Sequence, residues 1–329
     1  MGRAPVTRNL DAETTKACRS SPDLRTEGCT VASSSGLTAV ERGPTSANRP
    51  PNGEILDLGK ARLIKGDIVD VLSSLPNQSF DLAIADPPYG VYSKHPWKLP
   101  EGHGLPGFGG EWKIASHAWD RVSALAGFDW TLSWLAELRR LVKPTGSIWL
   151  HGTYHNIGLL NIGCQLLDLE IINDVVWLKR NAFPNLSCRR LTASHESMLW
   201  VHTGGKARKY RFNYDRVKSA SFNGDSLKSA GTQLRTVWDI PNNKTREEIE
   251  RGGHPTQKPL RLLERMIMVS GTPGGRVLVP FLGSGSAAVA AIRQSMAPVG
   301  IENDGTYFEK ARAWVASCYD THQARLNVE

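Results

Sequence analysis

The sequence contains few cysteines and no long hydrophobic run. Its odd and scattered thiols form no Cys-x-x-Cys pair and have no close histidine partner, so we expect no zinc site or other metal site. Such sparse usage is typical of reduced thiols in a cytoplasmic protein. No stretch of about 18 apolar residues occurs, and the N-terminus lacks the compact apolar core of a secretory signal, so we expect no membrane span. The cysteines are Cys18, Cys29, Cys164, Cys188 and Cys318.

Positive charge, in contrast, is in excess. The 329 residues carry a formal net charge of +8, while 40% are hydrophobic and 22% are charged. The last two fractions are ordinary for a globular protein with a sizeable core. The excess charge favours a polyanionic partner such as nucleic acid.

Residues 1–55 differ from the rest of the chain. They are rich in Ser, Thr, Arg, Gly and Pro, and no apolar periodicity runs through them. We therefore predict a disordered tail, which serves as a solvated linker more readily than as a grip on phosphates. Residues 56–320 are predicted to form the folded domain.

Within that domain, short apolar runs alternate with helical patterns. This alternation predicts an α/β fold with a layered, parallel sheet. Residues 93–120 are predicted to be a long loop, and its histidines, His95, His103 and His117, are spaced too unevenly to suggest metal ligands. The predicted strands are 61–67, 80–85, 147–151, 171–178, 194–202, 276–281 and 298–301; the predicted helices are 68–75, 130–142, 156–168, 259–269, 286–294 and 305–317.

The first chemical motif is Asp86-Pro87-Pro88-Tyr89, directly after an apolar strand. An exocyclic amino group of a base is a poor nucleophile because its lone pair is delocalised into the ring. A carboxylate and a backbone carbonyl that both accept from the same NH2 would localise that lone pair. Asp86 supplies the first acceptor and Pro87 the second, aimed by prolines that fix φ at about −65°. Tyr89 offers an aromatic face on which a base can stack.

The second motif is the turn Phe281-Leu282-Gly283-Ser284-Gly285, between a strand and a helix. Its glycines would let a ligand approach the backbone, and the helix start offers free N–H groups. Glu302 ends the next strand and could accept from ribose hydroxyls, so the unit suits a nucleoside cofactor. A packed unit without a ligand is the alternative.

Two shorter segments add polar groups. Thr256 and Lys258, at the start of a helix, could meet a carboxylate such as that of methionine, or simply form a polar helix start. Asp67 could accept from an adenine amino group, cap the helix that follows, or do both. Residues 180–250 combine basic and aromatic residues, which suits phosphate and base-edge contacts. The basic candidates for DNA contact are Arg180, Arg189, Arg190, Lys206, Arg208, Lys209 and Arg211.

In this order, the segments resemble the β class of DNA amino-methyltransferases, which modify adenine N6 or cytosine N4. The matching pieces also include Lys143 to Ser147 and Ser194-His195-Glu196, and the resemblance spans about residues 60–317. It implies a Rossmann-like, seven-stranded and mostly parallel sheet with a circularly permuted chain order. It also implies a target-recognition insertion at about 180–250.

The same resemblance assigns roles to single residues. Asp86, Pro87 and Tyr89 correspond to the catalytic group that surrounds a flipped base. The cofactor is implied to be S-adenosylmethionine, and the partner is implied to be double-stranded DNA. A cognate restriction endonuclease and a homodimer are both compatible with this class. Cofactor contacts map to Asp67, Thr256, Lys258, Phe281, Gly283, Gly285 and Glu302.

One departure from the family pattern and three alternatives remain. The family usually has Asp where this chain has Val279, before Pro280-Phe281, so a carboxylate that helps to position the cofactor is missing. This keeps open a DNA-binding protein with weak or lost methyl transfer. An Asp at position 86 favours adenine N6 over cytosine N4 as the target. An RNA base or a protein amide is a further alternative, and the basic and aromatic segment favours a nucleic acid over a protein.

Overall fold

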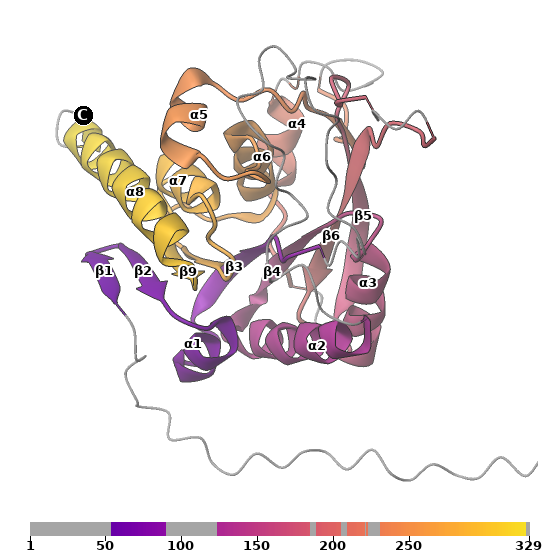
Figure 1. The fold of residues 1–329 in the computed structure, drawn as a ribbon, viewed down its shortest axis with the longest axis horizontal. Helices are drawn as coiled ribbons and strands as arrows, with labels where there is room; N and C mark the ends of the chain where they lie inside the picture. The colour runs from indigo at the N-terminus through magenta and orange to yellow at the C-terminus, as the bar shows by residue number, and fades with distance from the viewer. Residues whose placement is uncertain are drawn as a thin grey trace, which may run out of the picture. The chain divides into compact units, whose positions relative to one another are not determined.

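The computed structural model describes residues 54–89, 124–184, 189–204, 209–220, 222 and 231–326. Within them, one nine-stranded sheet has the order β1-β2-β9-β8-β3-β4-β6-β5-β7, with helices on both faces (Figure 1). The strands are β1 (Ile55–Leu58), β2 (Ala61–Lys65), β3 (Phe80–Ala85), β4 (Val142–Gly152), β5 (Glu170–Leu178), β6 (His195–His202), β7 (Val237–Asp239), β8 (Arg276–Val279) and β9 (Ala297–Glu302). The helices are α1 (Ile68–Ser74), α2 (Ala124–Leu141), α3 (Ile157–Leu166), α4 (Tyr214–Ser219), α5 (Arg246–Gly252), α6 (Leu260–Ser270), α7 (Ser286–Arg293) and α8 (Gly305–Leu326).

The seven central strands, from β2 to β5, are the seven that the sequence predicts. All neighbours among them are parallel except for β6, which runs antiparallel to both β4 and β5. Early and late segments alternate: β3 pairs with β8, with Leu82 opposite Val277. The permuted, Rossmann-like order is therefore confirmed. The two extra strands, β1 and β7, lie at the sheet edges and are too short to leave a periodic signal.

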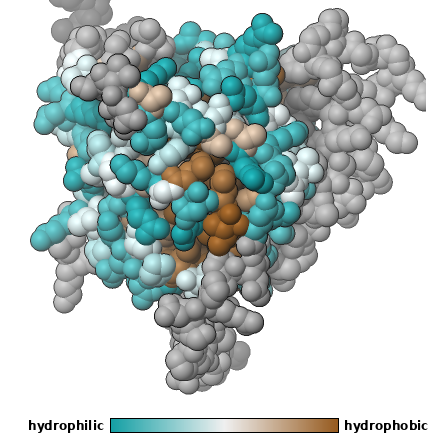
Figure 2. Space-filling view, turned by 90° about the vertical axis from the view of Figure 1, so that its left-hand side faces the viewer, coloured by the Kyte–Doolittle hydropathy of each residue, from teal (hydrophilic) through white to brown (hydrophobic). Residues whose placement is uncertain are grey.

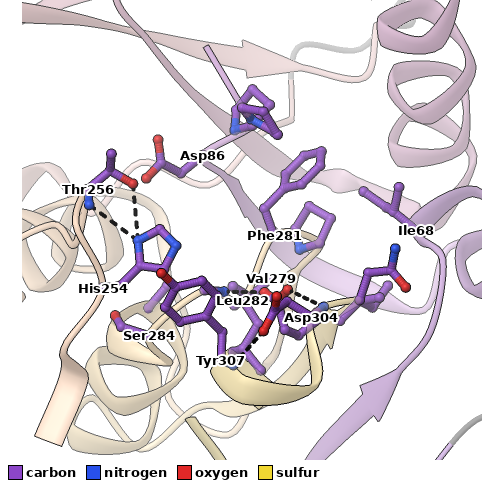
Figure 3. A pocket seen from close by; sticks show the side chains of 18 of the residues that line it. Ile68, Asp86, His254, Thr256, Val279, Phe281, Leu282, Ser284, Asp304 and Tyr307 are labelled. Atoms are coloured by element: carbon purple, nitrogen blue, oxygen red, sulfur yellow. Dashed lines mark hydrogen bonds between the residues drawn. The ribbon is translucent and has the colours of Figure 1, made fainter. Parts of the chain in front are cut away.

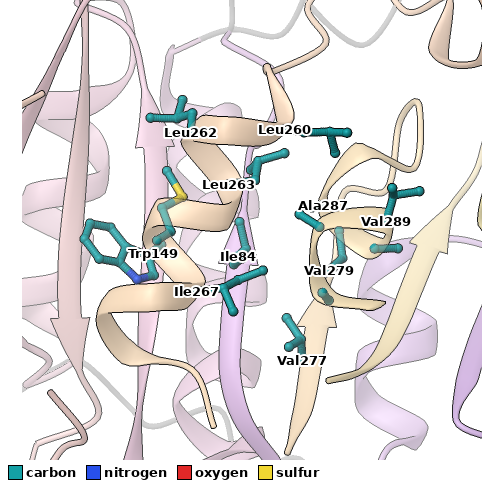
Figure 4. Packing of buried hydrophobic residues seen from close by; sticks show 14 of the residues in the cluster. Ile84, Trp149, Leu260, Leu262, Leu263, Ile267, Val277, Val279, Ala287 and Val289 are labelled. Carbon is teal, nitrogen blue, oxygen red and sulfur yellow. The ribbon is translucent and has the colours of Figure 1, made fainter. Parts of the chain in front are cut away.

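Two hydrophobic layers hold the helices to the sheet. On one face, α6, α7 and α8 cover a cluster that includes Ile84, Trp149 and Val277 (Figure 4). On the other face, α1, α2 and α3 cover Phe80, Ala83 and Leu150. Successive residues of β3 thus alternate between the two layers, which explains why this strand is apolar except for Asp81.

Several boundaries differ from the predicted ones. β4 begins at Val142 rather than 147, because Gly146 lets its backbone approach β3: a Cβ there would lie 2.5 Å from the Asp81 carbonyl oxygen. Helix α5 was not predicted because it is mostly polar, although Thr245 and Glu248 form a capping box at its start. α4 was also missed, and α8 extends to Leu326 rather than 317.

Figure 2 shows a surface that is mostly hydrophilic, with hydrophobic residues gathered near its centre. Among the described helices, none is both long and apolar enough to cross a membrane. The described residues also contain no cluster of His, Cys, Asp and Glu that could hold a metal ion. The predicted tail up to residue 53, the loop at 93–120 and the positions Lys206 and Arg208 lie outside the described residues.

Candidate active site

The predicted motifs meet where the parallel strands have their carboxyl ends, a side of the sheet that we call the carboxyl edge; the amino edge is the side where these strands begin. Because β2, β9, β8 and β3 are parallel, their carboxyl ends lie together, and the segments that follow them line a cavity of about 460 Å³ (Figure 3). This volume is in the usual range for small-molecule sites. The predicted residues that line it are Asp67, Asp86, Pro87, Tyr89, Thr256, Lys258, Phe281, Gly283 and Glu302.

Gly285 is the one predicted cofactor residue that is not among the lining residues. Its φ is +87°, and it precedes α7 as the N-cap. A Cβ at this position would lie 3.1 Å from the Cα of Ala311 in α8. The structure therefore gives Gly285 a packing role, between α7 and α8, beside whatever role it has toward a ligand.

Glu302 shapes the end of the cavity beside the glycine turn. Its Oε2 accepts from the Gly283 N–H at 2.8 Å, and its Oε1 accepts from the Asp304 N–H at 2.9 Å. Burial raises its pKa, although these backbone N–H groups act in the opposite direction. Each carboxylate oxygen has a second lone pair for a further donor, such as a hydroxyl group.

Asp67 lies at the same end and caps α1. Its Oδ1 accepts from the backbone N–H groups of Val69 at 2.9 Å and Asp70 at 3.4 Å. Since both capping bonds end on Oδ1 and the residue lines the cavity, the two predicted roles of Asp67 are compatible.

Aromatic residues form another part of the wall. The Phe281 ring lies 5.7 Å from the Trp130 ring and 5.2 Å from the Trp134 ring, between centroids. Trp130 lines the cavity and was not predicted, since it belongs to an amphipathic helix, where core packing explains an aromatic residue equally well. Val279 is also in the wall and is 1% exposed. Although it replaces the carboxylate that the family usually has at this position, four other carboxylates line the cavity: Asp67, Asp86, Glu302 and Asp304.

The segment before α6 forms the opposite wall. His254 Nδ1 accepts from the Thr256 N–H at 3.3 Å and lies 3.2 Å from its Oγ1 (Figure 3). Lys258 is predicted to meet a cofactor carboxylate, but here its Nζ donates to Asp86 Oδ2 at 2.8 Å. It also donates to the Tyr89 hydroxyl group, which in turn donates to Asp86 Oδ1 at 2.7 Å. A lysine thus contacts two residues of the Asp-Pro-Pro-Tyr motif.

Behind Lys258 is a buried ionic network that the sequence did not assign. Glu196 Oε2 lies 2.5 Å from His151 Nε2 and 3.7 Å from Lys258 Nζ, while Oε1 accepts from Lys179 Nζ at 2.9 Å. Burial alone would raise the pKa of Glu196, but Lys258, His151 and Lys179 hold it well below its ordinary value. The sequence signal was present, since Glu196 belongs to the Ser-His-Glu segment of the family resemblance.

Some of the predicted basic residues lie at the carboxyl edge of the sheet and others at the amino edge. Arg180 follows β5, and Arg189 and Arg190 precede the antiparallel β6, so all three lie at the carboxyl edge with Asp86. Arg180 is paired there with Asp239 at 2.5 Å. Lys209 and Arg211 lie at the opposite edge, where the Arg211 N–H donates to the Thr145 carbonyl at 3.0 Å.

Comparisons with known proteins agree with this geometry. The model of the N6/N4 DNA methylase family matches residues 80–313, from β3 into α8. The chain belongs to the DNA methylase family. It is therefore a DNA amino-methyltransferase of the N6 or N4 type, as the sequence resemblance implied.

Two curated type II methyltransferases are similar in sequence. M2.DpnII of Streptococcus pneumoniae is 33% identical over 255 residues, which cover 77% of this chain and 88% of that protein. M.HinfI of Haemophilus influenzae is 34% identical over 254 residues, which cover 76% of this chain and 66% of that protein.

Solved structures share the fold. The cytosine-N4-specific PvuII DNA methyltransferase has a TM-score of 0.56 and 18% identity, covering 82% of this chain and 93% of its own. M1.HpyAVI, solved as a complex with SAM, has a TM-score of 0.51 and 22% identity, covering 77% of this chain and 98% of its own. At these identities the likeness supports the fold. The expected cofactor, S-adenosylmethionine, agrees with these comparisons.

Proposed function

We propose that the protein is a site-specific DNA methyltransferase that modifies the exocyclic amino group of a flipped base, with adenine N6 as the target. The observation that carries this proposal is the shared cavity of Asp86-Pro87-Pro88-Tyr89 and the Glu302–Gly283 pair. An amino-group acceptor and a nucleoside site thus open into the same space.

The cavity fits S-adenosylmethionine, which supplies the methyl group when bound. Glu302 would accept from the ribose hydroxyls, and Asp67 would accept from the adenine amino group. Gly283, with φ of +52° and no side chain, leaves room for a ligand against the backbone between Glu302 and His254. Phe281 and Trp130 would contact the apolar parts.

Asp86 and the Pro87 carbonyl would hold the NH2 of the target base, which stacks on Tyr89. Flipping the base out of the duplex costs a few kcal/mol, which these contacts offset. As the nitrogen takes the methyl group, the Asp86 carboxylate stabilises the positive charge that develops there. The extra proton then leaves through Asp86 or water.

The DNA duplex would be held by Arg189 and Arg190, both exposed at the carboxyl edge. Arg190 is close enough to His155, at the start of α3, to lower the pKa of that histidine together with its burial, which acts more strongly. Phosphate contacts of this kind make binding dependent on salt. A cognate restriction endonuclease and a homodimer belong to the same proposal as partners.

Adenine is favoured over cytosine by the Asp at position 86. N4-cytosine methylation is the alternative, since both amino groups need the same two acceptors and the family contains both activities. A second candidate, a DNA-binding protein with weak transfer, rests on Val279, whose apolar side chain lines the cavity where the family usually has a carboxylate.

The test is incubation with methyl-tritiated cofactor and DNA of mixed sequence, then digestion to nucleosides. We expect the label in N6-methyladenine. Label in N4-methylcytosine would favour the alternative base. Tight DNA binding without label, together with no heat of cofactor binding in titration calorimetry, would favour the second candidate.

A further inference from the structure

Both acceptor oxygens of Asp86 already have donors in the structure. Tyr89 donates to Oδ1 and Lys258 donates to Oδ2. Each oxygen has a second lone pair, so a substrate amino group can bind beside these donors or displace one of them. Of the two donors, Lys258 is the charged one, and its ammonium group would repel the positive charge that develops on the substrate nitrogen.

This repulsion favours the withdrawal of Lys258 from Asp86. The positive charge that develops on the substrate nitrogen is stabilised by the Asp86 carboxylate, and an ammonium group 2.8 Å from that carboxylate opposes this effect. Burial tends to lower the pKa of Lys258, but Asp86 and Glu196 outweigh it and raise the pKa, so the side chain stays charged at neutral pH.

Lys258 cannot withdraw into solvent. Its side chain is 5% exposed, and an unpaired ammonium group at this depth would be strongly disfavoured. The second carboxylate within ion-pair distance, among the described residues, is Glu196, whose Oε2 lies 3.7 Å from Nζ. The charged groups around the two carboxylates also include Lys179 and Lys244.

Glu196 is fixed in place by three adjacent strands. It lies on β6, between His151 at the end of β4 and Lys179 just after β5, and contacts both. These contacts hold the Glu196 carboxylate beside Lys258, so the ammonium group can reach it by a side-chain movement alone. Glu196 is therefore ready to receive the ammonium group over a short path.

We propose that Glu196 is a positioning residue that receives the Lys258 ammonium when the substrate amino group takes its place on Asp86. Glu196 acts through Lys258 and touches neither base nor cofactor. This inference rests on the proposed function and adds to it a residue outside the cavity wall.

The test is Glu196→Gln, which keeps the side-chain shape and removes the charge. We expect kcat for DNA methylation to fall about 10- to 100-fold, as for other losses of positioning. The KM for DNA and the cofactor Kd from calorimetry should stay close to those of the wild type. Glu196→Asp, which keeps the charge, should be more active than the Gln variant.

Glu170→Gln is the matched control. Glu170 also pairs with a buried histidine on the same sheet, His202 at 3.8 Å, but at the opposite edge. Its kcat should equal that of the wild type.

Three results would overturn the inference: a fall in kcat of less than about threefold in Glu196→Gln; an Asp variant no more active than the Gln variant; or a parallel loss of cofactor affinity. The proposed function fails separately, if the wild-type protein labels no DNA.

Discussion

Strand β3 has an aspartate near its start and another just after its end, and the two have different kinds of partner. Asp81, at the amino edge of the sheet, binds Lys143 at 2.7 Å and the Arg276 N–H at 2.8 Å. Asp86, at the carboxyl edge, binds Lys258 and Tyr89 inside the cavity. The first joins three strands, whereas the second faces a space that a ligand can enter.

The two histidine–glutamate pairs repeat this difference. His202 and Glu170, at the amino edge, are 3.8 Å apart, and His202 Nε2 also lies 2.8 Å from the Pro144 carbonyl. His151 and Glu196, at the carboxyl edge, have two lysines as additional partners. Similar residues thus serve packing at one edge and charge placement at the other, because the carboxyl ends of parallel strands converge on one site only.

The largest effect that separates the two edges should come from Asp86→Ala. Removing the carboxylate removes one of the two acceptors that hold the target amino group, so methyl transfer should fall about 100- to 1,000-fold. Cofactor and DNA binding should be largely kept. The measurement is single-turnover transfer of tritiated methyl groups to DNA. Asp81→Ala is the control and should retain its kcat; comparable activity of the two variants would contradict the assignment of Asp86.

DNA binding gives the second comparison. Replacing Arg189 and Arg190 by Ala together should make the slope of log K against log salt less steep by about two units, one for each lost phosphate contact. The matched variant replaces Lys209 and Arg211, which have the same charge but lie at the amino edge. Its slope should equal that of the wild type. Fluorescence anisotropy with one labelled duplex, over a series of salt concentrations, measures both.

An equal change of slope in the two variants would mean that the duplex also reaches the amino edge. In that case basic residues of the 180–250 segment would contact DNA whether they lie at the carboxyl edge or at the amino edge. A change confined to the Lys209 and Arg211 variant would reverse the assignment of the DNA-binding edge.

The sequence predicts much of this fold because the central strands contain distinct apolar runs and the intervening helices are amphipathic. It predicts the cavity because most of the motifs follow a strand, and parallel strands bring such segments together. The short edge strands β1 and β7 leave no periodic signal, and α5 was missed because its face is polar.

The contacts that could not be predicted depend on the register of strand pairing and on how deeply each side chain is buried. The sequence gives no indication that Lys258 turns toward Asp86, since a lysine beside a ligand site fits a cofactor carboxylate equally well. The contact between Glu196 and His151 depends on the antiparallel pairing of β6 with β4. The separation of Arg189 from Arg211 has the same origin, because β6 carries the chain from one edge of the sheet to the other.

A third, smaller effect concerns stability at the amino edge. Asp81→Ala should lower the free energy of unfolding by about 1–3 kcal/mol, because it leaves the partly buried Arg276 N–H without its acceptor. Urea denaturation, followed by circular dichroism, measures it. Asp57→Ala, which removes an exposed pair with Arg62, is the control and should have a smaller effect. A loss of kcat without a loss of stability in Asp81→Ala would mean that Asp81, at the amino edge, contributes to methyl transfer, which contradicts its assigned structural role.

The smallest effect should be the pH dependence of the stability that Glu196 contributes. Its pKa in the folded protein is held well below 4.5, because Lys258, His151 and Lys179 together outweigh the opposing effect of burial. A carboxylate with a lowered pKa stabilises the fold above its unfolded pKa, and this contribution is lost as the pH falls through the folded value.

Wild-type protein and Glu196→Gln should therefore differ most in free energy of unfolding at neutral pH, and the difference should shrink as the pH falls below 4.5. Urea denaturation at a series of pH values provides the comparison, with Glu170→Gln as the variant from the opposite edge. A difference between wild type and Glu196→Gln that stays constant over the whole range would mean that the Glu196 carboxylate is not held by its lysines in the folded protein. The contrast between the two histidine–glutamate pairs would then be one of distance alone.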